Sequence, residues 1–402
     1  MKAPDDRAVI GFLFNHDAGH QAGHLTPILG AYADARPQDD VCAFVAPGEV
    51  ADMVRKATAR PNVRIVELKA PAALSAPARV LDLAFPASRS ARLRSNLAAF
   101  SGLDALVTPE HAALKLKPLI PAGVSFIYSG HGAGDRAYGF DAALSAFDLI
   151  LAPGMKSVRR FKAAGAINGN AYALVGYPKF DAAPAAPERF FDNDNPVVLY
   201  NPHFSPAFSS WYRAGVKVLD WFAANKDLNL IFAPHVMLYR RPVHMTPGEG
   251  AIGWARRAPA RFFRMPNIRI DVGSRRLFDM SYTAAADLYV GDASSQVLEF
   301  LLRPRPCVFF NAHGRDWRGD PNFAHWRCGE VVEDIESLGA AIRAGLASRD
   351  AYRLAQQEHF SDTFDLTHEP SAARAAAAIA RFVDEKKQRR ATGDLAGLRA
   401  AS

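Results

Sequence analysis

Short apolar runs that alternate with helical patterns constrain the fold of this chain more than any other feature. Runs such as VCAFVAP, VSFIYSG, LIFAPH and DLYVGD are almost continuously apolar and end in Gly, Pro, His or Asp. Strands that are buried on both faces of a parallel sheet have this pattern, with polar residues at their carboxyl ends. The alternation predicts an α/β fold of doubly wound, Rossmann-type sheets, whose carboxyl-end loops carry the functional residues.

The length and one irregular stretch predict two domains. The chain has 402 residues, and the stretch DAAPAAPERFFDNDNP, from Asp181 to Pro196, is rich in Pro, Ala, Asp and Asn without any periodicity. Such a stretch is typical of an interdomain linker. We expect a first domain over 1–182, a second over 183–385 and a basic, disordered tail over 386–402. The C-terminal helix is a candidate for crossing back onto the first domain, and the two sheets are expected to face a central cleft.

Composition limits the cellular compartment and the binding partners that we expect. Lys and Arg number 48 against 41 Asp and Glu, for a net charge of +7, which suits an anionic partner or simply reflects a basic tail. The three cysteines, Cys42, Cys307 and Cys328, are too scattered for a disulfide framework or a zinc site, which indicates a reducing compartment. We find no apolar run of the roughly 20 residues that a membrane span needs and no signal-peptide pattern. We therefore expect a cytoplasmic protein.

Three histidines follow the first predicted strand at intervals of four residues. His16, His20 and His24 lie in FNHDAGHQAGHLTP. On a helix they would share one face and could chelate a metal ion. The glycines between them argue against a regular helix, and Asp17 is the one carboxylate beside them, so we expect no metal site.

Gly23, His24 and Pro27 form a Gly-His-x-x-Pro arrangement in the same loop. Glycine lets the backbone approach a ligand, and Pro27 is suited to the first turn of a helix. His24 would then point into the cleft as a candidate catalytic residue. The alternative is a loop histidine that only caps the helix.

A second histidine lies in a glycine-rich loop, IYSGHGAGDRAYGFD. The predicted strand ends at Ser129, and His131 follows between two glycines, where its imidazole could reach a substrate. Because histidine titrates near neutrality, His131 could take a proton from an attacking hydroxyl. Asp135 could orient His131, and Arg136 could bind an anion. The alternative is a glycine-rich loop that only turns a corner.

Two strands of the second half end in Pro-His. His203 follows LYNP with several serines nearby, and His235 follows LIFAP with Arg240 close behind. At the strand ends of a nucleotide-binding domain such residues would donate hydrogen bonds or positive charge to a diphosphate. Core packing would explain one such histidine more readily than two.

The stretch ADLYVGDASSQVLEF predicts a strand, a tight turn and a helix start. Ser294 and Ser295 lie where a helix cap belongs, so capping is the simplest explanation. Glu299 falls one position too late for a capping box counted from Ser295. Beside the Pro-His strand ends, Asp292 and the two hydroxyls could instead hold a diphosphate, and we group Glu299 with this donor site. Neither a P-loop nor a Gly-x-Gly-x-x-Gly helix start is present.

These motifs, in this order, resemble one known family. GHGAGDRAYGFD, DLILAPG, VGYPKFD, LYNPH, APH and AAADLYVGDASSQVLEFLLRPRPCVFFN together are similar to the CDP-glycerol glycerophosphotransferases, the group of teichoic-acid polymerases and their relatives. The similarity covers about 125–315, and the Gly-His-x-x-Pro loop fits the wider GT-B glycosyltransferases. It implies a GT-B fold, a nucleotide-activated donor bound mainly by the second domain, and transfer without a metal or other cofactor.

The resemblance also implies roles for individual residues. His131 matches the family's general base, while His235, Asp292, Ser294 and Ser295 match positions that bind the donor phosphates. The sequence departs from the family in two places. It has AGDR after His-Gly where the family commonly has a Pro-Leu-Lys type of run, and Lys179 where the family commonly has Arg.

The sequence leads to three functional hypotheses. The first is a transferase that moves glycerol phosphate or a sugar from a donor such as CDP-glycerol to a hydroxyl of a polymer or lipid-linked acceptor in cell-envelope synthesis. Its base would be His131 with His24 as the rival, and it would contact the inner membrane surface peripherally and bind no nucleic acid. The second is an enzyme like UDP-N-acetylglucosamine 2-epimerase or another nucleotide-sugar glycosyltransferase. The third is a noncatalytic nucleotide-sugar binding protein.

Overall fold

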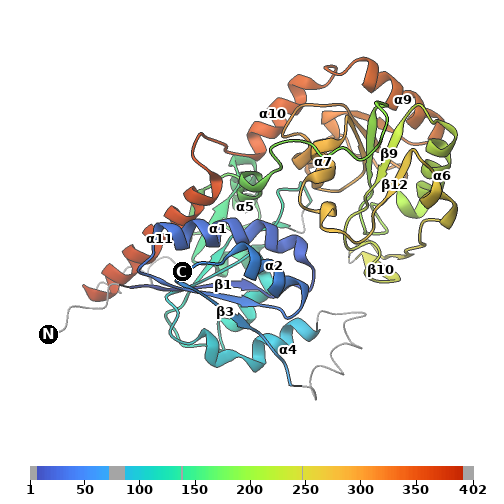
Figure 1. The fold of residues 1–402 in the computed structure, drawn as a ribbon. Helices are drawn as coiled ribbons and strands as arrows, with labels where there is room; N and C mark the ends of the chain where they lie inside the picture. The colour runs from blue at the N-terminus through green and yellow to red at the C-terminus, as the bar shows by residue number, and fades with distance from the viewer. Residues whose placement is uncertain (1–6, 72–86, 137–138, 247, 393–402) are drawn as a thin grey trace. The chain divides into compact units, whose positions relative to one another are not determined.

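The chain divides into two compact units (Figure 1). The computed structural model describes residues 7–71, 87–136, 139–246 and 248–392. Unit 1 comprises Met1–His131, Phe140–Ala182 and Asp362–Ser402, and unit 2 comprises Gly132–Gly139 and Ala183–Ser361.

Unit 1 is built on a seven-stranded parallel sheet in the order β3-β2-β1-β4-β5-β6-β7. Its strands are β1 Val9–Phe14, β2 Asp40–Val45, β3 Val63–Glu67, β4 Ala105–Thr108, β5 Ser125–Tyr128, β6 Leu149–Ala152 and β7 Ala171–Leu174. Its described α-helices are α1 Ala22–Ala35, α2 Glu49–Ala57, α4 Ala87–Ser95, α5 Met155–Ala163 and α11 Ser371–Ala391.

Both faces of this sheet are buried, as the apolar runs predict. Ile10, Phe12 and Phe14 of β1 belong to one core cluster, together with residues of α1, α2 and α11. Leu13, the alternate residue, belongs to a second cluster with Phe126 of β5. Because successive side chains of a strand point to opposite faces, the two clusters lie on the two sides of the sheet.

Unit 2 is built on a six-stranded parallel sheet in the order β12-β9-β8-β13-β14-β15. Its strands are β8 Val197–Asn201, β9 Asn229–Phe232, β12 Ile268–Ile270, β13 Leu288–Gly291, β14 Cys307–Phe310 and β15 Glu330–Val332, and its described α-helices include α6 Trp211–Ala224, α7 Ser281–Ala285, α8 Gln296–Phe300 and α9 Ile335–Ala347. A separate antiparallel hairpin joins β10 Val243–Thr246 to β11 Ala251–Trp254. Helix α10 spans Arg353–Thr363, and the boundary between the two units falls within it, after Ser361.

The C-terminal helix belongs to unit 1. Figure 1 shows α11, in red, beside α1, in blue, and the apolar side chains of Ile379 and Val383 enter the core cluster that contains α1. Arg36 after α1 makes two hydrogen bonds to the carboxylate of Asp384, at 2.9 and 3.0 Å. The N–H groups of Ser371 and Ala372 donate to the carboxylate of Asp181, at 3.1 and 2.6 Å. Asp181, at the predicted start of the linker, therefore caps α11.

These contacts change the boundaries expected from the sequence. Residues 362–385 were expected in the second domain, yet they form part of unit 1 because the alanine-rich face of α11 completes the core over α1. The expected disordered tail over 386–402 differs as well, since α11 continues to Ala391. Lys386 lies 3.4 Å from the carboxylate of Asp148, and Lys387 donates to the carbonyl of Arg7. Residues 393–402 lie outside the described part of the chain.

The packing of α11 makes a first prediction. The side chain of Ile379 is fully buried, so Ile379→Ala should leave a cavity and lower the free energy of unfolding by about 2–4 kcal/mol. Denaturant unfolding followed by circular dichroism measures the change. Arg381→Ala, at an exposed position of the same helix, is the control and should leave the transition almost unchanged. Equal effects of the two substitutions would contradict the assignment of α11 to the core of unit 1.

Candidate functional site

The carboxyl ends of three neighbouring strands in unit 2 carry the residues singled out in the sequence. His203 follows β8, His235 follows β9 and Asp292 follows β13, and β9, β8 and β13 are adjacent in the sheet. In an open α/β sheet, loops at this edge are the usual place for a ligand. The parallel order of the strands thus brings together three motifs that are up to 89 positions apart in the sequence.

Asp292 is a buried junction between these loops. One carboxylate oxygen accepts from the N–H groups of His203 and Ala293, at 2.8 and 2.7 Å. The other accepts from the N–H and the hydroxyl of Ser210, at 2.6 and 2.8 Å. Burial raises the pKa of the Asp292 carboxyl group, and these donors oppose the rise.

This geometry corrects the role expected for Asp292. It was grouped with residues that contact the donor phosphates, but both carboxylate oxygens already accept hydrogen bonds from the protein. A buried carboxylate would also repel a diphosphate. Asp292 instead fixes the positions of the loops after β8 and β13.

His203 and Arg136 are held against each other. Nη1 of Arg136 lies 3.0 Å from Nε2 and 3.3 Å from Nδ1 of His203, and its guanidinium lies 4.1 Å from the centre of the Phe208 ring. The N–H of Ser205 donates to Nδ1 of His203 at 3.0 Å. Burial, and then the charge of Arg136, lower the pKa of His203 well below its ordinary value, so the imidazole is neutral.

His235 lies beside this pair. Its ring centre is 5.1 Å from that of His203 and 4.8 Å from that of Phe204. Its Nδ1 accepts from the N–H of Met237 at 3.2 Å, so the neutral ring carries its proton on Nε2 and can donate there. Arg240 lies in the turn that follows and is itself exposed.

The start of α8 contacts the glycine-rich loop. A Cβ added to Gly132 would lie 3.4 Å from the Ser295 hydroxyl, and one added to Gly134 would lie 3.0 Å from the Ser295 Cβ. The loop can approach Ser295 this closely because its residues there lack side chains. GHGAGDR and DASS, quoted separately in the sequence, are therefore in contact in unit 2.

Exposure separates the predicted donor residues into two groups. Ser294, Glu299, His203 and Asp292 are buried, and the Ser294 hydroxyl accepts from the N–H of Gln296 at 3.4 Å. Polar groups that remain at least partly accessible belong to Arg136, His235, Arg240 and Ser295. The accessible side chains can contact a ligand directly. The buried side chains hold the accessible ones in place.

Asp135 has a different partner from the one expected. Its carboxylate accepts from the N–H of His325 at 2.8 Å and lies 2.9 Å from Nδ1 of the same residue. Nε2 of His325 lies 3.0 Å from the carbonyl oxygen of Asp292. Asp135 was expected to orient His131, but it belongs to the segment of the loop that packs into unit 2, where it positions His325.

His325 was not recognised in the sequence. It lies in a short 3-10 segment, Pro321–Cys328, and not at the end of an apolar run. The neighbouring Trp326 donates from its indole N–H to the carbonyl of Asp292 at 2.8 Å. In the sequence, only the pair His-Trp after Asp320-Pro321 could have drawn attention to this segment, and the pair belongs to no motif used above.

His131 lies at the end of β5 in unit 1. Its Nδ1 lies 2.9 Å from the carbonyl oxygen of Pro109 and can only donate to it, which leaves a lone pair on Nε2 of the neutral ring. Solvent reaches the side chain, yet the surrounding protein desolvates the ring and lowers its pKa, with a smaller contribution from the charge of Arg89. This arrangement suits a proton acceptor at neutral pH.

The first loop differs from its expected form. Gly19–Gln21 form a 3-10 turn that continues into α1 at Ala22, so the glycines do not interrupt helical structure and Pro27 is the sixth residue of α1. His24 is half-buried, and its ring lies 5.4 Å from that of Tyr177. Burial, and then the charge of Lys179, lower the pKa of His24 well below its ordinary value.

His16 and His20 pack against each other, with ring centres 4.7 Å apart. Nδ1 of His16 accepts from the N–H of Ala18 at 2.9 Å. Within the described ranges, no cluster of three or more His, Cys, Asp or Glu residues is arranged to hold a metal ion.

Unit 1 also holds a network of charged side chains that no sequence motif predicted. Arg92 pairs with Asp17 at 2.7 Å and donates to the side chain of Asn15 at 3.0 Å. Arg89 lies 3.5 Å from the carboxylates of both Asp17 and Glu110. Burial raises the pKa of Glu110, and Arg89 opposes the rise. These side chains follow β1 and β4 or come from α4, so they gather at the edge of the sheet where His131 follows β5.

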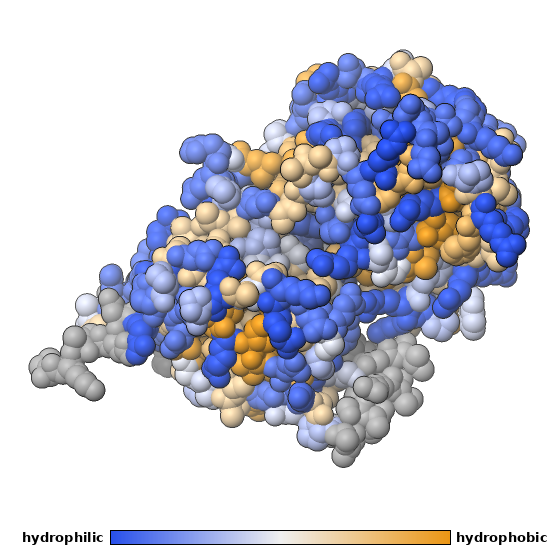
Figure 2. Space-filling model, viewed as in Figure 1, coloured by the Kyte–Doolittle hydropathy of each residue, from blue (hydrophilic) through white to orange (hydrophobic). Residues whose placement is uncertain are grey.

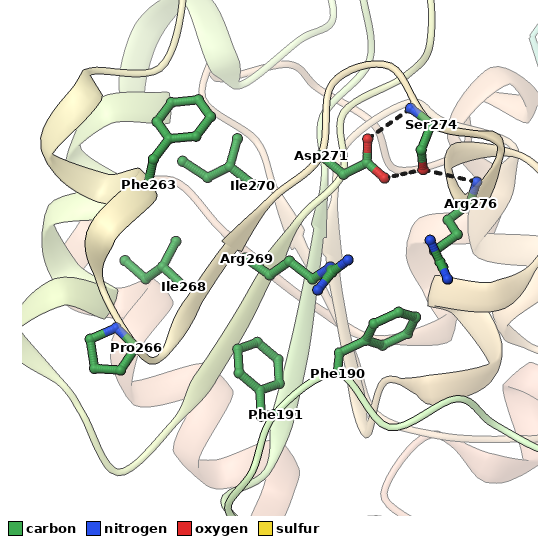
Figure 3. A pocket seen from close by; sticks show the side chains of 10 residues that line it. All are labelled: Phe190, Phe191, Phe263, Pro266, Ile268, Arg269, Ile270, Asp271, Ser274 and Arg276. Atoms are coloured by element: carbon green, nitrogen blue, oxygen red, sulfur yellow. Dashed lines mark hydrogen bonds between the residues drawn. The ribbon is translucent and has the colours of Figure 1, made fainter.

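A separate hollow of about 510 Å³ lies along β12, the edge strand of the unit 2 sheet (Figure 3). Phe190 and Phe191 of the predicted linker line it, with Arg269 about 5.0 Å from the centre of the Phe190 ring. Arg276 is paired with Glu188 at 2.8 Å. None of the histidines described above lines this hollow.

Comparisons with known proteins agree with this architecture. No protein-family model and no curated protein matches the sequence. A structure of the wall teichoic acid polymerase TagF matches with a TM-score of 0.62 at 13% identity, covering 96% of this chain and 92% of that one. A UDP-N-acetylglucosamine 2-epimerase matches with a TM-score of 0.59 at 11% identity, covering 95% and 97%. The glycotransferase of kitacinnamycin matches with a TM-score of 0.50 at 16% identity, covering 93% and 99%.

The chain has the GT-B fold. The predicted fold class is thereby confirmed, and the solved relatives include the type of polymerase that the motifs resemble. In a GT-B protein the two Rossmann-like sheets are separate units, as they are here.

The contact between Gly134 and Ser295 makes a second prediction. Gly134→Ala should force the loop or α8 to move by a few tenths of an ångström and destabilise unit 2 by about 1 kcal/mol. Gly139→Ala is the matched control, because it lies in the same loop and an added Cβ would meet nothing within 4 Å. Melting temperatures of the two variants measure the difference, and equal values would contradict the contact.

The buried imidazole of His203 makes a third prediction. The pKa of His203 in the folded state lies below its ordinary value of 6.5. As the pH falls through 6.5, the unfolded state therefore binds more protons than the folded state, and the protein loses stability. His203→Asn keeps an acceptor for the Ser205 N–H but cannot be protonated. Its melting temperature should fall less than that of the wild type between about pH 7.5 and about pH 5.5. His368→Asn, at an exposed position, serves as control, and an undiminished fall in His203→Asn would refute the prediction.

Proposed function

We propose that this protein is a transferase that moves glycerol phosphate from CDP-glycerol to a hydroxyl of a polymer or lipid-linked acceptor in cell-envelope synthesis. The observation that carries the proposal is the contact of the GHGAGDR loop with Ser295 at the start of α8. This contact lies within unit 2 and places the glycines that follow His131 in the sequence against the motif that most specifically resembles the glycerophosphotransferases. The fold of TagF supports the same reading, and one TagF structure comes from a soak with CDPG.

His131 is the proposed base. Its Nδ1–H is directed to the carbonyl of Pro109, so Nε2 accepts the proton of the acceptor hydroxyl. The hydroxyl oxygen forms a bond to the phosphorus that carries glycerol, and the bond from that phosphorus to the oxygen of CMP breaks. The proton resides on His131 and the electron pair leaves with CMP.

The departing phosphate needs positive charge and hydrogen-bond donors. Arg136 and His235 lie on adjacent loops of unit 2 and remain partly accessible, as does the Ser295 hydroxyl. We propose that these three groups stabilise the negative charge of the leaving group, with the exposed Arg240 as a further contributor. In this proposal the transfer needs no metal ion, because Arg136 supplies a permanent positive charge.

The deciding experiment measures CMP release from CDP-glycerol in the presence of a glycerol phosphate oligomer. His131→Ala should lower kcat roughly a hundredfold or more while donor affinity changes little, because a base acts on the acceptor. His235→Ala should weaken donor binding, measured by the thermal shift that CDP-glycerol produces. His368→Ala is the control at an exposed histidine. If His131→Ala keeps full turnover and His24→Ala loses it, then His24 and not His131 is the base.

An epimerase acting on UDP-N-acetylglucosamine is the second candidate. The sequence showed few carboxylates near the candidate base, but the structure places Asp17 and Glu110 around Arg89 at the edge of the sheet that bears His131. Such carboxylates could move a proton at a sugar carbon. Nuclear magnetic resonance of UDP-N-acetylglucosamine incubated with the protein separates the two, since an epimerase converts the sugar to its epimer and a glycerophosphotransferase leaves it unchanged. A nucleotide that binds but undergoes neither reaction would favour a noncatalytic binding protein.

A further inference from the structure

The hairpin β10–β11 exposes a row of large apolar side chains. On the face drawn in Figure 2, hydrophilic side chains dominate and hydrophobic ones form separate areas. Among the described residues, large exposed apolar side chains gather on this hairpin, where Val243, Met245, Ile252 and Trp254 are 39%, 60%, 71% and 66% exposed. Exposed patches of this kind mark interaction sites more often than chance.

The register shows that these four side chains share one face. Val243 is paired with Trp254, and Met245 is paired with Ile252. Directly paired residues of an antiparallel ladder point to the same side, and residues two apart along a strand do so too. The four side chains therefore form two adjacent cross-strand pairs on the outer face of the hairpin.

The opposite face of the hairpin is fixed to unit 2. The hydroxyls of Thr246 and Ser205 lie 2.7 Å apart, and Nε2 of His244 lies 2.9 Å from the carbonyl oxygen of Leu238. A Cβ added to Gly253 would lie 2.7 Å from the Tyr212 ring. At the tip, Arg315 pairs with Glu249 at 2.8 Å. The apolar face is thus presented by a fixed element and cannot be hidden by folding the hairpin over.

Positive charge surrounds the open end of the hairpin. Arg240 and Arg241 come just before β10, and Arg256 and Arg257 come just after β11. Because Val243 pairs with Trp254, both pairs of arginines lie at the same end. Tryptophan and aliphatic side chains beside arginines are the combination that inserts into the interface of an anionic bilayer, where indole and guanidinium meet headgroups.

We propose that the outer face of the β10–β11 hairpin docks the protein onto an anionic lipid bilayer. Val243, Met245, Ile252 and Trp254 enter the interface. Arg241, Arg256 and Arg257 contact the anionic headgroups. No helix in the described parts of the chain is long and apolar enough to cross a membrane, so the docking is peripheral. Four side chains are fewer than the roughly 20 residues a side of a stable protein interface, which favours a bilayer over a second copy of the chain.

The docking surface is connected to the candidate donor site. Thr246 on the inner face contacts Ser205, and the Ser205 N–H donates to His203. Docking through the outer face therefore places the β8 loop close to the lipid surface. This inference stands apart from the proposed transfer reaction, because vesicle binding is measured without donor or acceptor.

The test is flotation of the full chain with vesicles of phosphatidylcholine alone or mixed with phosphatidylglycerol. The wild type should float with the anionic vesicles and much less with phosphatidylcholine alone, and added salt should weaken the binding. All five tryptophans lie in described parts of the chain and only Trp254 is exposed, so its emission should shift to the blue on binding. Absence of binding to anionic vesicles would overturn the proposal.

Variants separate the hairpin from the rest of the surface. Ile252→Ser with Trp254→Ser should weaken binding to anionic vesicles at least roughly tenfold, and Arg256→Ser with Arg257→Ser should do so to a similar degree. Leu354→Ser is the matched control, since Leu354 is also 71% exposed but lies on α10. Unchanged melting temperatures show that the hairpin variants are folded.

Two results would contradict the assignment. Equal binding by the wild type and by Ile252→Ser with Trp254→Ser would place the lipid contact elsewhere. Sedimentation velocity tests whether a second copy of the chain binds this face instead. Self-association of the wild type that the double substitution abolishes would show that it does.

Discussion

The buried carboxylate of Asp292 is the interaction on which the rest of unit 2 depends. It takes hydrogen bonds from the main chain at His203 and Ser210 and from the Ser210 hydroxyl, while its own carbonyl receives those of His325 and Trp326. A buried charge is tolerable only when such donors surround it. Loss of the loop after β8 would leave that charge poorly compensated, and loss of the segment with His325 would leave the Asp292 carbonyl without two of its donors.

The distribution of charge at the candidate site of unit 2 bears on its proposed role. Arg136 is held against a neutral His203 and over the face of Phe208. The buried carboxylates nearby, Asp135 and Asp292, are occupied by N–H and O–H donors of the protein. The negative charge of these carboxylates is therefore directed at protein donors, which suits the anion site that we propose.

The sequence predicts the sheets well and the contacts of the site only in part. Each long apolar run forms a strand of the two parallel sheets, because burial on both faces leaves a clear pattern. The hairpin β10–β11 and the short strand β15 were not predicted, since strands of only four or three residues are too short to show such a pattern. His203, His235 and Ser295 could be grouped because strand ends gather at one edge. The partners of Asp135 and Asp292 could not, because His325 and Ser210 come from segments without any periodic signal.

The return of α11 to unit 1 sets an order for folding during synthesis. Unit 2 is complete in sequence at Ser361, whereas the core around α1 still lacks Ile379 and Val383 at that point. A ribosome adds residues from the N-terminus, and domains encoded first usually fold first. Here the domain that begins the chain is finished last. While the remaining residues are synthesised, the apolar face of α1 that α11 will cover stays uncovered, so the nascent chain has an exposed hydrophobic surface for chaperones to bind.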